Sequence, residues 1–315
     1  AYCFSLAAIN IPGNVANIGN SGFCQCTSLT SVTLLDGVTR IGYLAFWGCT
    51  ALTALTLPDS VTDIGSLAFY NCASLASVVI GNGVTNIGDH AFYNCESLAA
   101  VLFTGDAPMV GDSTFSETPD ILTLYHFPDA ADWSSTLAGI PAEPIPLSYT
   151  SDGTRVTVTG FEGSYAGHHL FLPATSNGCP VTAIGDNAFF DRFSLTAVTL
   201  PDSVTDIGNY AFYWCVSLAS VAIGNSVTNI GDNAFDHCFS LASVSLPNSV
   251  TDIGYGAFIY CDALTSAVIG NNVTSIGDYA FYGCPSLAAV LFTGDVPAIG
   301  DHTFDETPAS LTFYY

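Results

Sequence analysis

The stretch Leu75-Ala-Ser-Val78-Val-Ile80-Gly-Asn-Gly-Val84-Thr-Asn-Ile87-Gly88-Asp-His-Ala91-Phe92-Tyr-Asn-Cys95 determines the fold, because close copies of it recur along the chain. Each copy contains an Ile-Gly or Val-Gly pair, whose first residue is called the anchor below, and within each of two series the anchors lie 23 residues apart. The anchors are Ile18, Ile41, Ile64, Ile87 and Val110, then Ile184, Ile207, Ile230, Ile253, Ile276 and Ile299. Self-similarity at a fixed period is the signature of a repeat architecture.

One repeat can be converted into geometry. The pattern Leu-x-x-Val-x-Ile/Leu has the period of a short strand with one buried face, and a proline or glycine ends it. A second short extended piece follows and ends at the anchor. We expect the glycine after the anchor to turn the chain through positive φ. An Ala-Phe pair then occupies a tight turn or short helical segment, with Phe in the core. No coil buries its apolar side chains alone, so stacked coils, a solenoid, are predicted.

These columns resemble the BspA-like leucine-rich repeats, whose consensus is close to L-x-x-V-x-L-P-x-S-V-T-x-I-G-x-x-A-F-x-x-C. The resemblance covers nearly all of the chain except residues 116–170. It implies a leucine-rich-repeat solenoid of the α/β horseshoe type, β-rich, with short parallel strands and short helical turns. It also implies a surface-exposed or secreted protein, since the family is largely bacterial and protist and some of its members are adhesins.

A longer repeat lies above the first. Residues 57–125 match residues 246–314 at most positions, at an offset of 189 residues. The interruption between the two series holds the Pro-rich residues 140–146, which predict an extended linker, and an atypical segment around Trp133, which predicts a cap. We therefore predict two tandem modules, residues 1–146 with cap and linker at about 116–146, and residues 147–315. The first is expected to be truncated at its N-terminus and the second at its C-terminus, as a window from a longer array.

Composition restricts the partners. The chain carries 27 acidic residues against 3 arginines and no lysine, for a formal net charge of −24. Such a charge repels nucleic acid and anionic lipid surfaces. No apolar run approaches the roughly 18 residues of a membrane span. Neither nucleic-acid binding nor membrane insertion is predicted.

The cysteines form one column, eight residues after the anchor. Its members are Cys3, Cys26, Cys49, Cys72 and Cys95, then Cys215, Cys238, Cys261 and Cys284. An inward column favours cysteine acting as a small hydrophobe. Adjacent coils lie about 5 Å apart, so disulfides along the ladder stay geometrically possible. Cys24 and Cys26 lack a second Cys or His pair at zinc spacing, so a structural role is preferred and no cofactor is predicted.

Aspartates recur two residues after the anchor, where Asp186, Asp232 and Asp278 are weak candidates for calcium binding. In this column Asp mostly alternates with a neutral residue, which spreads like charges along a solvated face. No loop has the dense acidic pattern of a calcium loop. The interpretation without a metal is preferred.

Tyrosine and tryptophan gather around the Ala-Phe turn. The candidate strip comprises Trp47, Tyr70, Tyr93, Tyr213, Trp214, Tyr260 and Tyr282. One interpretation is that these rings cover the core of the neighbouring coil and leave their polar atoms in water. The other is an aromatic binding strip for protein or glycan, because Tyr and Trp dominate interface hot spots.

Catalytic signatures are missing from the sequence. It has no G-x-S-x-G motif, a Walker phosphate loop is impossible without lysine, and the six histidines are scattered. No carboxylate is expected to break the pattern inside an apolar pocket that would tune its pKa. The sequence predicts a protein that is not an enzyme.

Two function classes remain. The first is an extracellular or cell-surface scaffold for protein or glycan binding and adhesion, multivalent through its tandem modules. The alternative is a structural subunit of a surface fibre or layer, in which copies of the chain stack head to tail.

Overall fold

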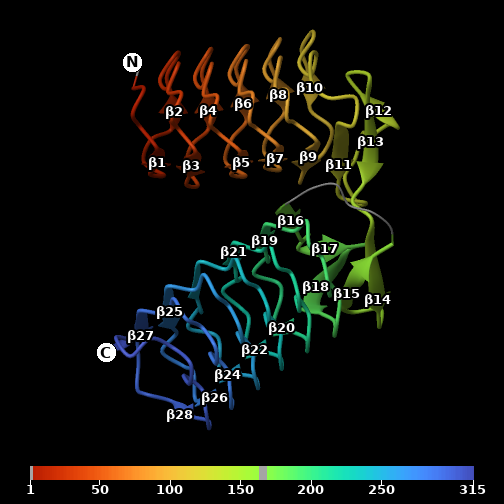
Figure 1. The fold of residues 1–315 in the computed structure, drawn as a ribbon. Coiled ribbons are helices and arrows are strands. Elements are labelled where there is room, and N and C mark those ends of the chain that lie inside the picture. The colour runs from red at the N-terminus through yellow and green to blue at the C-terminus, as the bar shows by residue number, and fades with distance from the viewer. Residues whose placement is uncertain (1–2, 163–168) are drawn as a thin grey trace. The chain divides into compact units, whose positions relative to one another are not determined.

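The computed structural model describes residues 3–162 and 169–315, which form short strands joined by turns (Figure 1). The chain divides into two compact units, Ala1–Ile145 and Pro146–Tyr315. Both units are stacks of coils, and each coil contributes one main strand and one two-residue strand that ends at the anchor.

In the first unit nearly all strand pairs are parallel. The main strands are β1 (Ala8–Ile11), β3 (Ser31–Leu34), β5 (Ala54–Leu57), β7 (Ser77–Ile80), β9 (Ala100–Phe103) and β11 (Thr123–His126). The two-residue strands β2 (Asn17–Ile18), β4 (Arg40–Ile41), β6 (Asp63–Ile64), β8 (Asn86–Ile87) and β10 (Met109–Val110) form a second sheet. At the far end β13 (Ile140–Pro144) pairs in parallel with β11, and β12 (Thr136–Leu137) folds back on it antiparallel.

The second unit opens on an antiparallel hairpin of β14 (Leu147–Ser151) and β15 (Val156–Phe161). The sheet continues through β18 (Cys179–Ile184), which also pairs with β17 (Thr175–Ser176), to β20 (Asp206–Ile207), β22 (Asn229–Ile230), β24 (Asp252–Ile253), β26 (Ser275–Ile276) and β28 (Ala298–Ile299). The main strands are β16 (His169–Phe171), β19 (Ala197–Thr199), β21 (Ser220–Ala222), β23 (Ser243–Ser245), β25 (Ser266–Ile269), β27 (Ala289–Phe292) and β29 (Thr312–Tyr314).

The 23-residue period of the sequence is the register of the stack. Ile41 pairs with Ile64 and Val78 with Val101, so every core position lies on its own copy in the next coil. Phe46 and Phe69 are fully buried and stack with ring centroids 5.3 Å apart. Burying one such side chain contributes roughly 1.5–3 kcal/mol, and the column repeats that gain in every coil.

The short helical turns and the α/β horseshoe are wrong, because the described residues form a β-solenoid and contain no helix. The described residues therefore include no helix that could cross a membrane. Within the Ala-Phe turn every second backbone amide donates to the next coil, and the others donate within their own coil. Phe92 N donates to Thr114 O of the next coil at 2.9 Å, whereas Tyr93 N donates to His90 O at 3.2 Å. Left-handed residues, such as His90 (φ 56°) and Asn94 (φ 56°), recur three and seven positions after each anchor and block helix propagation.

The glycine after the anchor was expected at positive φ, and this is also wrong, because none of these glycines has positive φ. These positions require glycine because the backbone of the preceding coil lies very close to them. A Cβ on Gly88 would lie 2.4 Å from Ser66 N, and one on Gly65 would lie 2.9 Å from Ile41 O. Only glycine lets neighbouring coils come this near.

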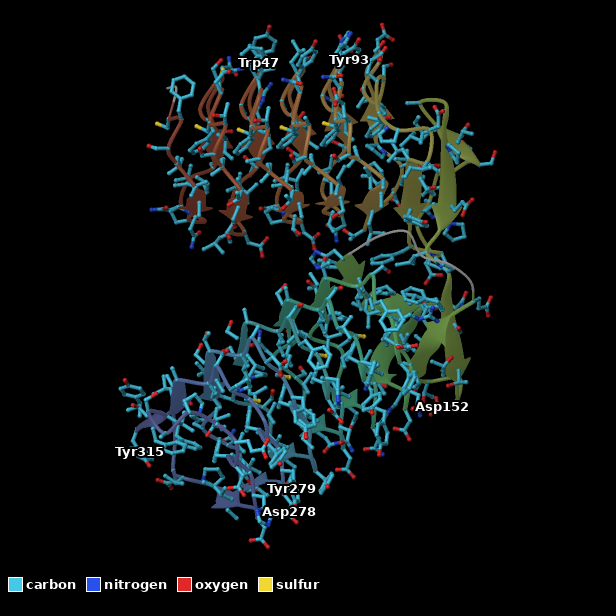
Figure 2. All side chains as sticks on the ribbon, viewed as in Figure 1. Trp47, Tyr93, Asp152, Asp278, Tyr279 and Tyr315 are labelled. Atoms are coloured by element: carbon cyan, nitrogen blue, oxygen red, sulfur yellow. The ribbon has the colours of Figure 1, made fainter. Side chains whose placement is uncertain are left out.

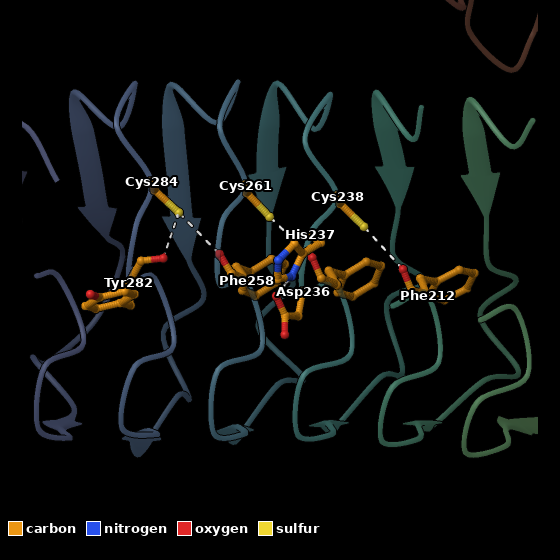
Figure 3. Close-up of polar contacts among 9 residues, drawn as sticks. Phe212, Asp236, His237, Cys238, Phe258, Cys261, Tyr282 and Cys284 are labelled. Atoms are coloured by element: carbon orange, nitrogen blue, oxygen red, sulfur yellow. Dashed lines mark hydrogen bonds and ion pairs between the residues drawn. The ribbon is translucent and has the colours of Figure 1, made fainter. Parts of the chain in front are cut away.

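All eleven cysteines are free thiols, so the disulfide ladder that the sequence left open is not formed. Apart from Cys26, each buried column thiol donates to the carbonyl of the preceding coil's phenylalanine: Cys72 Sγ lies 3.3 Å from Phe46 O, and Cys238 Sγ 3.3 Å from Phe212 O (Figure 3). Phe46 O also accepts the amide of Cys49. The buried carbonyl of Phe46 thus accepts two hydrogen bonds, one from a backbone amide and one from a thiol. This explains why the column uses cysteine, which is small and apolar and can donate a hydrogen bond.

Candidate functional site

The candidate aromatic residues lie at two places in the turn, six and seven positions after the anchor. Trp47, Tyr70 and Tyr93 belong to the first unit, and Figure 2 shows Trp47 and Tyr93 at the turn side of that unit. Tyr213, Trp214, Tyr260 and Tyr282 belong to the second unit. The structure thus divides the candidate strip into two separate clusters.

The turn backbone of the second unit is a rigid base for its cluster. Trp214 N donates to Asp236 O at 3.0 Å, His237 N to Ile259 O at 2.9 Å, and Tyr260 N to Tyr282 O at 3.0 Å. Trp214 (φ 60°), His237 (φ 60°) and Tyr260 (φ 53°) are all left-handed. That conformation costs a bulky residue roughly 1–2 kcal/mol, so the hydrogen bonds between coils hold these side chains in place.

In the first unit the rings cover one another. Tyr70 and Tyr93 stack at 5.1 Å with an angle of 7° between their planes, and His90 lies against Tyr93 at 5.5 Å. Trp47, Tyr70 and Tyr93 are all partly buried. This arrangement is the one expected if the rings mainly cover the neighbouring coil.

In the second unit the rings form a continuous network around His237. Trp214 stacks on His237 at 5.1 Å, Tyr213 lies at 5.8 Å, and Tyr260 meets His237 edge to face at 5.0 Å. Tyr282 extends the network, edge to face with Tyr260 at 5.8 Å. Four of the seven candidate residues are therefore brought together. Further rings that join the network are Phe190, Tyr210, Phe239, Tyr255, Tyr279 and His302.

Beneath this network lies a carboxylate that the sequence reasoning missed. Asp236 is buried, and its Oδ1 lies 2.5 Å from Nδ1 of His237 (Figure 3). Burial raises the pKa of Asp236 to about 6, while the adjacent His237 opposes the rise. The expectation that no carboxylate breaks the pattern in an apolar setting is wrong. A signal was present, since six of the eleven repeats have an aromatic residue at this position.

Acidic groups surround the network. At one end the side chain of Tyr282 is hydrogen-bonded to Glu306, which raises the pKa of the tyrosine to about 12. Nearby, Nδ1 of His302 lies 2.6 Å from Oδ2 of Asp305, and this contact raises the pKa of His302. At the other end Asp191 occupies the coil before Trp214 in the same turn position. The site therefore combines aromatic rings with an excess of negative charge.

The weak calcium candidates have a structural role. Oδ1 of Asp186, Asp232 and Asp278 accepts the amide at the same position of the next coil, from Asn209, Tyr255 and Asp301, at 2.7–2.8 Å. In residues 3–162 and 169–315 no three His, Cys, Asp or Glu side chains come together as metal ligands would. Each carboxylate already holds its neighbouring coil.

The repeats and their stacking define a leucine-rich-repeat solenoid. A family model described as a BspA type leucine rich repeat region matches six copies, over residues 1–121 and 182–310. The chain belongs to this family.

Solved structures with the same repeats are related at a distance. A leucine-rich-repeat protein of T. pallidum is 30% identical, with 53% of this chain and 90% of that chain covered and a TM-score of 0.47. A leucine-rich cell surface protein of Faecalibacterium prausnitzii is 26% identical, with coverages of 92% and 88% and a TM-score of 0.43. A leucine-rich repeat protein of Bacteroides ovatus is 27% identical, with coverages of 99% and 79% and a TM-score of 0.45. No curated protein matches the chain.

Proposed function

We propose that the protein is a non-catalytic scaffold at the cell surface or outside the cell, which binds a protein or glycan ligand through the aromatic network of its second unit. The observation that carries this proposal is the difference between the two units. Phe190 and Tyr213 of the second unit stack as Tyr70 and Tyr93 do in the first, but the second unit extends its pair into a network in which Tyr260 and Tyr282 meet at 77°. Tilted rings leave apolar faces uncovered, and exposed aromatic surface on a rigid base is typical of binding sites.

The location outside the cell is supported by membership of the family, and the state of the thiols is compatible with it. Column cysteines such as Cys95 and Cys284 are buried, and burial raises the pKa of each to about 12. A thiol without thiolate character resists oxidation and exchange, so these side chains tolerate an oxidising environment.

Binding, rather than catalysis, is supported by the composition of the network. Asp236 is the one carboxylate buried within it, and its Oδ1 is occupied by His237. The remaining members are aromatic rings and the imidazoles of His237 and His302, and no Ser, Thr or Cys that the structure describes belongs to the network as a nucleophile that His237 could activate.

The test is binding to arrays of glycans and extracellular matrix proteins. The variant combines Tyr213→Ala with Trp214→Asn and Tyr260→Asn, because asparagine tolerates the left-handed backbone at the last two positions. Its control is Tyr70→Ala with Tyr93→Ala in the first unit. Loss of array binding in the first variant only, with unchanged melting, supports the proposal. Equal binding by both variants and the wild type contradicts it.

The alternative is a structural subunit that assembles head to tail. Near-identical coils offer similar surfaces at each end of a stack, and such contacts between copies do not close into a ring. Negative-stain electron microscopy with light scattering separates the two functions. Regular filaments or sheets favour the structural subunit, and separate particles favour the binding scaffold.

A further inference from the structure

Part of the ring surface in the second unit is open to solvent, although His237 covers one face of Trp214. Tyr210, Trp214, Tyr255 and Tyr260 are 40%, 39%, 46% and 37% exposed. Tyr210 meets Tyr213 at 74°, and Tyr260 meets His237 at 64°, so each pair buries one edge and one face rather than two faces. The face of an aromatic ring carries the negative part of its quadrupole and attracts cations, with tryptophan the strongest.

Carboxylates line this surface on several sides. Asp232 accepts the amide of Tyr255, Asp191 donates its own amide to the carbonyl of Tyr213, and Glu306 is hydrogen-bonded to Tyr282. Asp191 and Asp232 are exposed. Rings and carboxylates therefore act in the same direction, because both favour a positive charge placed over the turn.

The chain has little positive charge of its own to offer. Its basic residues are Arg40, Arg155 and Arg192. The guanidinium of Arg192 lies 5.2 Å from the ring centroid of Phe161, which is outside the network. A neutral glycan would gain from the ring faces but not from the charge, and an anionic ligand would be repelled. A cationic ligand gains from both.

Resting on the proposed function, we propose that the network of the second unit binds a basic protein segment whose arginine or lysine side chains lie over Trp214 and Tyr260. Arginine is preferred to lysine, because its planar guanidinium stacks on aromatic faces and is more weakly hydrated. The acidic side chains at the margin attract the segment and the rings hold it.

The probe is a six-residue peptide in which arginine alternates with serine, titrated by calorimetry at about 150 mM ionic strength. A second peptide replaces each arginine with lysine. A third replaces each arginine with citrulline, which keeps the planar shape and removes the charge. We expect the arginine peptide to bind at least about fivefold more tightly than either the lysine or the citrulline version.

Two variants separate ring binding from simple attraction to an acidic protein. Trp214→Asn with Tyr260→Asn removes rings without changing charge, and Asp191→Asn removes one charge beside Trp214; all three positions are left-handed, so asparagine suits them. Affinity for the arginine peptide should fall at least about tenfold in the ring variant and about twofold to threefold in the charge variant. The matched control is Tyr70→Ala, which should bind as the wild type does.

The outcomes also distinguish this inference from the function on which it rests. Unchanged peptide affinity in a ring variant that melts like the wild type overturns the inference, since the attraction would then be electrostatic alone. If a neutral oligosaccharide such as cellohexaose binds in a ring-dependent way and the arginine peptide does not, the proposed function stands and the inference fails. If neither the peptide nor any array ligand depends on the rings, both fail.

Discussion

Replacing Gly88 with alanine tests the role assigned to the glycine that follows each anchor. The new Cβ would lie 2.4 Å from Ser66 N and 2.8 Å from Ser66 Cα, whereas ordinary contacts of a Cβ begin at 3.4 Å. Relief requires the two coils to separate by about 1 Å. The bond from Gly88 N to Ile64 O is 2.8 Å long, so the same movement would break it.

The magnitude follows from the bonds that such a movement disturbs. Losing two or three hydrogen bonds between coils costs about 1 kcal/mol each, and strain in a packed interior adds about 1–3 kcal/mol. We therefore expect Gly88→Ala to lower the free energy of unfolding by about 3–6 kcal/mol. For a unit of this size the melting temperature should fall by about 10 °C, as measured by differential scanning calorimetry.

The control is Gly185→Ala at the same repeat position. Its nearest neighbours would be Val158 O at 3.2 Å and a methyl of Thr157 at 3.3 Å, so a loss below about 1 kcal/mol is expected. Gly88→Asn distinguishes close approach from backbone conformation, because asparagine tolerates positive φ but still carries a Cβ. The reasoning is refuted if Gly88→Ala is as mild as Gly185→Ala, or if Gly88→Asn is markedly milder than Gly88→Ala.

Three further predictions concern buried polar groups. Because burial raises the pKa of Asp236 to about 6 from 3.8, the wild type should lose up to about 2 kcal/mol of stability as pH rises from about 4 to 6, and Asp236→Asn should not. Urea denaturation across that range measures the difference, and identical pH profiles would contradict the assignment. Cys72→Ala removes a donor to Phe46 O and should cost about 1–2 kcal/mol in the same assay, more than Cys3→Ala at an exposed position. Titration of thiols at pH 8 should detect Cys3 and Cys179 quickly and the buried column only after denaturation, and rapid reaction of all thiols would contradict the buried column.

The sequence was sufficient to predict the stack because its period maps directly onto a register. When a core position such as Phe46 recurs at a fixed interval, the only arrangement that buries every copy places Phe69 upon it. Strand positions follow for the same reason. Inward residues such as Val32 and Leu34 alternate with the exposed Ser31 and Thr33, and this alternation marks one buried face.

The conformation of the turn could not be predicted in this way. Left-handed backbone is usually signalled by glycine or asparagine, yet here Leu44 (φ 54°) and Leu67 (φ 58°) adopt it. The hydrogen bonds between coils impose the conformation whatever the side chain. The glycine after the anchor misled for a related reason, since the coil beside it, not its own dihedral angles, demands the absence of a Cβ.

The candidate site could be predicted only in part. The aromatic positions follow from the repeat, but whether two rings stack or meet at an angle depends on which residues lie on the next coil. Asp236 was missed because its own repeat gives no sign of its burial or of its contact with His237, which lies against Tyr213 and Tyr260 of neighbouring coils. Such an environment is assembled across coils and is visible only when the columns are compared side by side.

Within a coil, the residues that hold neighbouring coils together can be separated from those that are free to serve a function. Anchors, core phenylalanines, column thiols and turn amides are all used in holding one coil to the next, as Cys238 and the amide of His237 illustrate. The outward side chains of the turn are free of that task, so they vary without loss of the stack. The second unit repeats the stacked pair of Tyr70 and Tyr93 at Phe190 and Tyr213, so covering the neighbouring coil accounts for those rings. The second unit also places Trp214 and Tyr260 at strained backbone positions, where they stay 39% and 37% exposed, a cost that a ligand would explain.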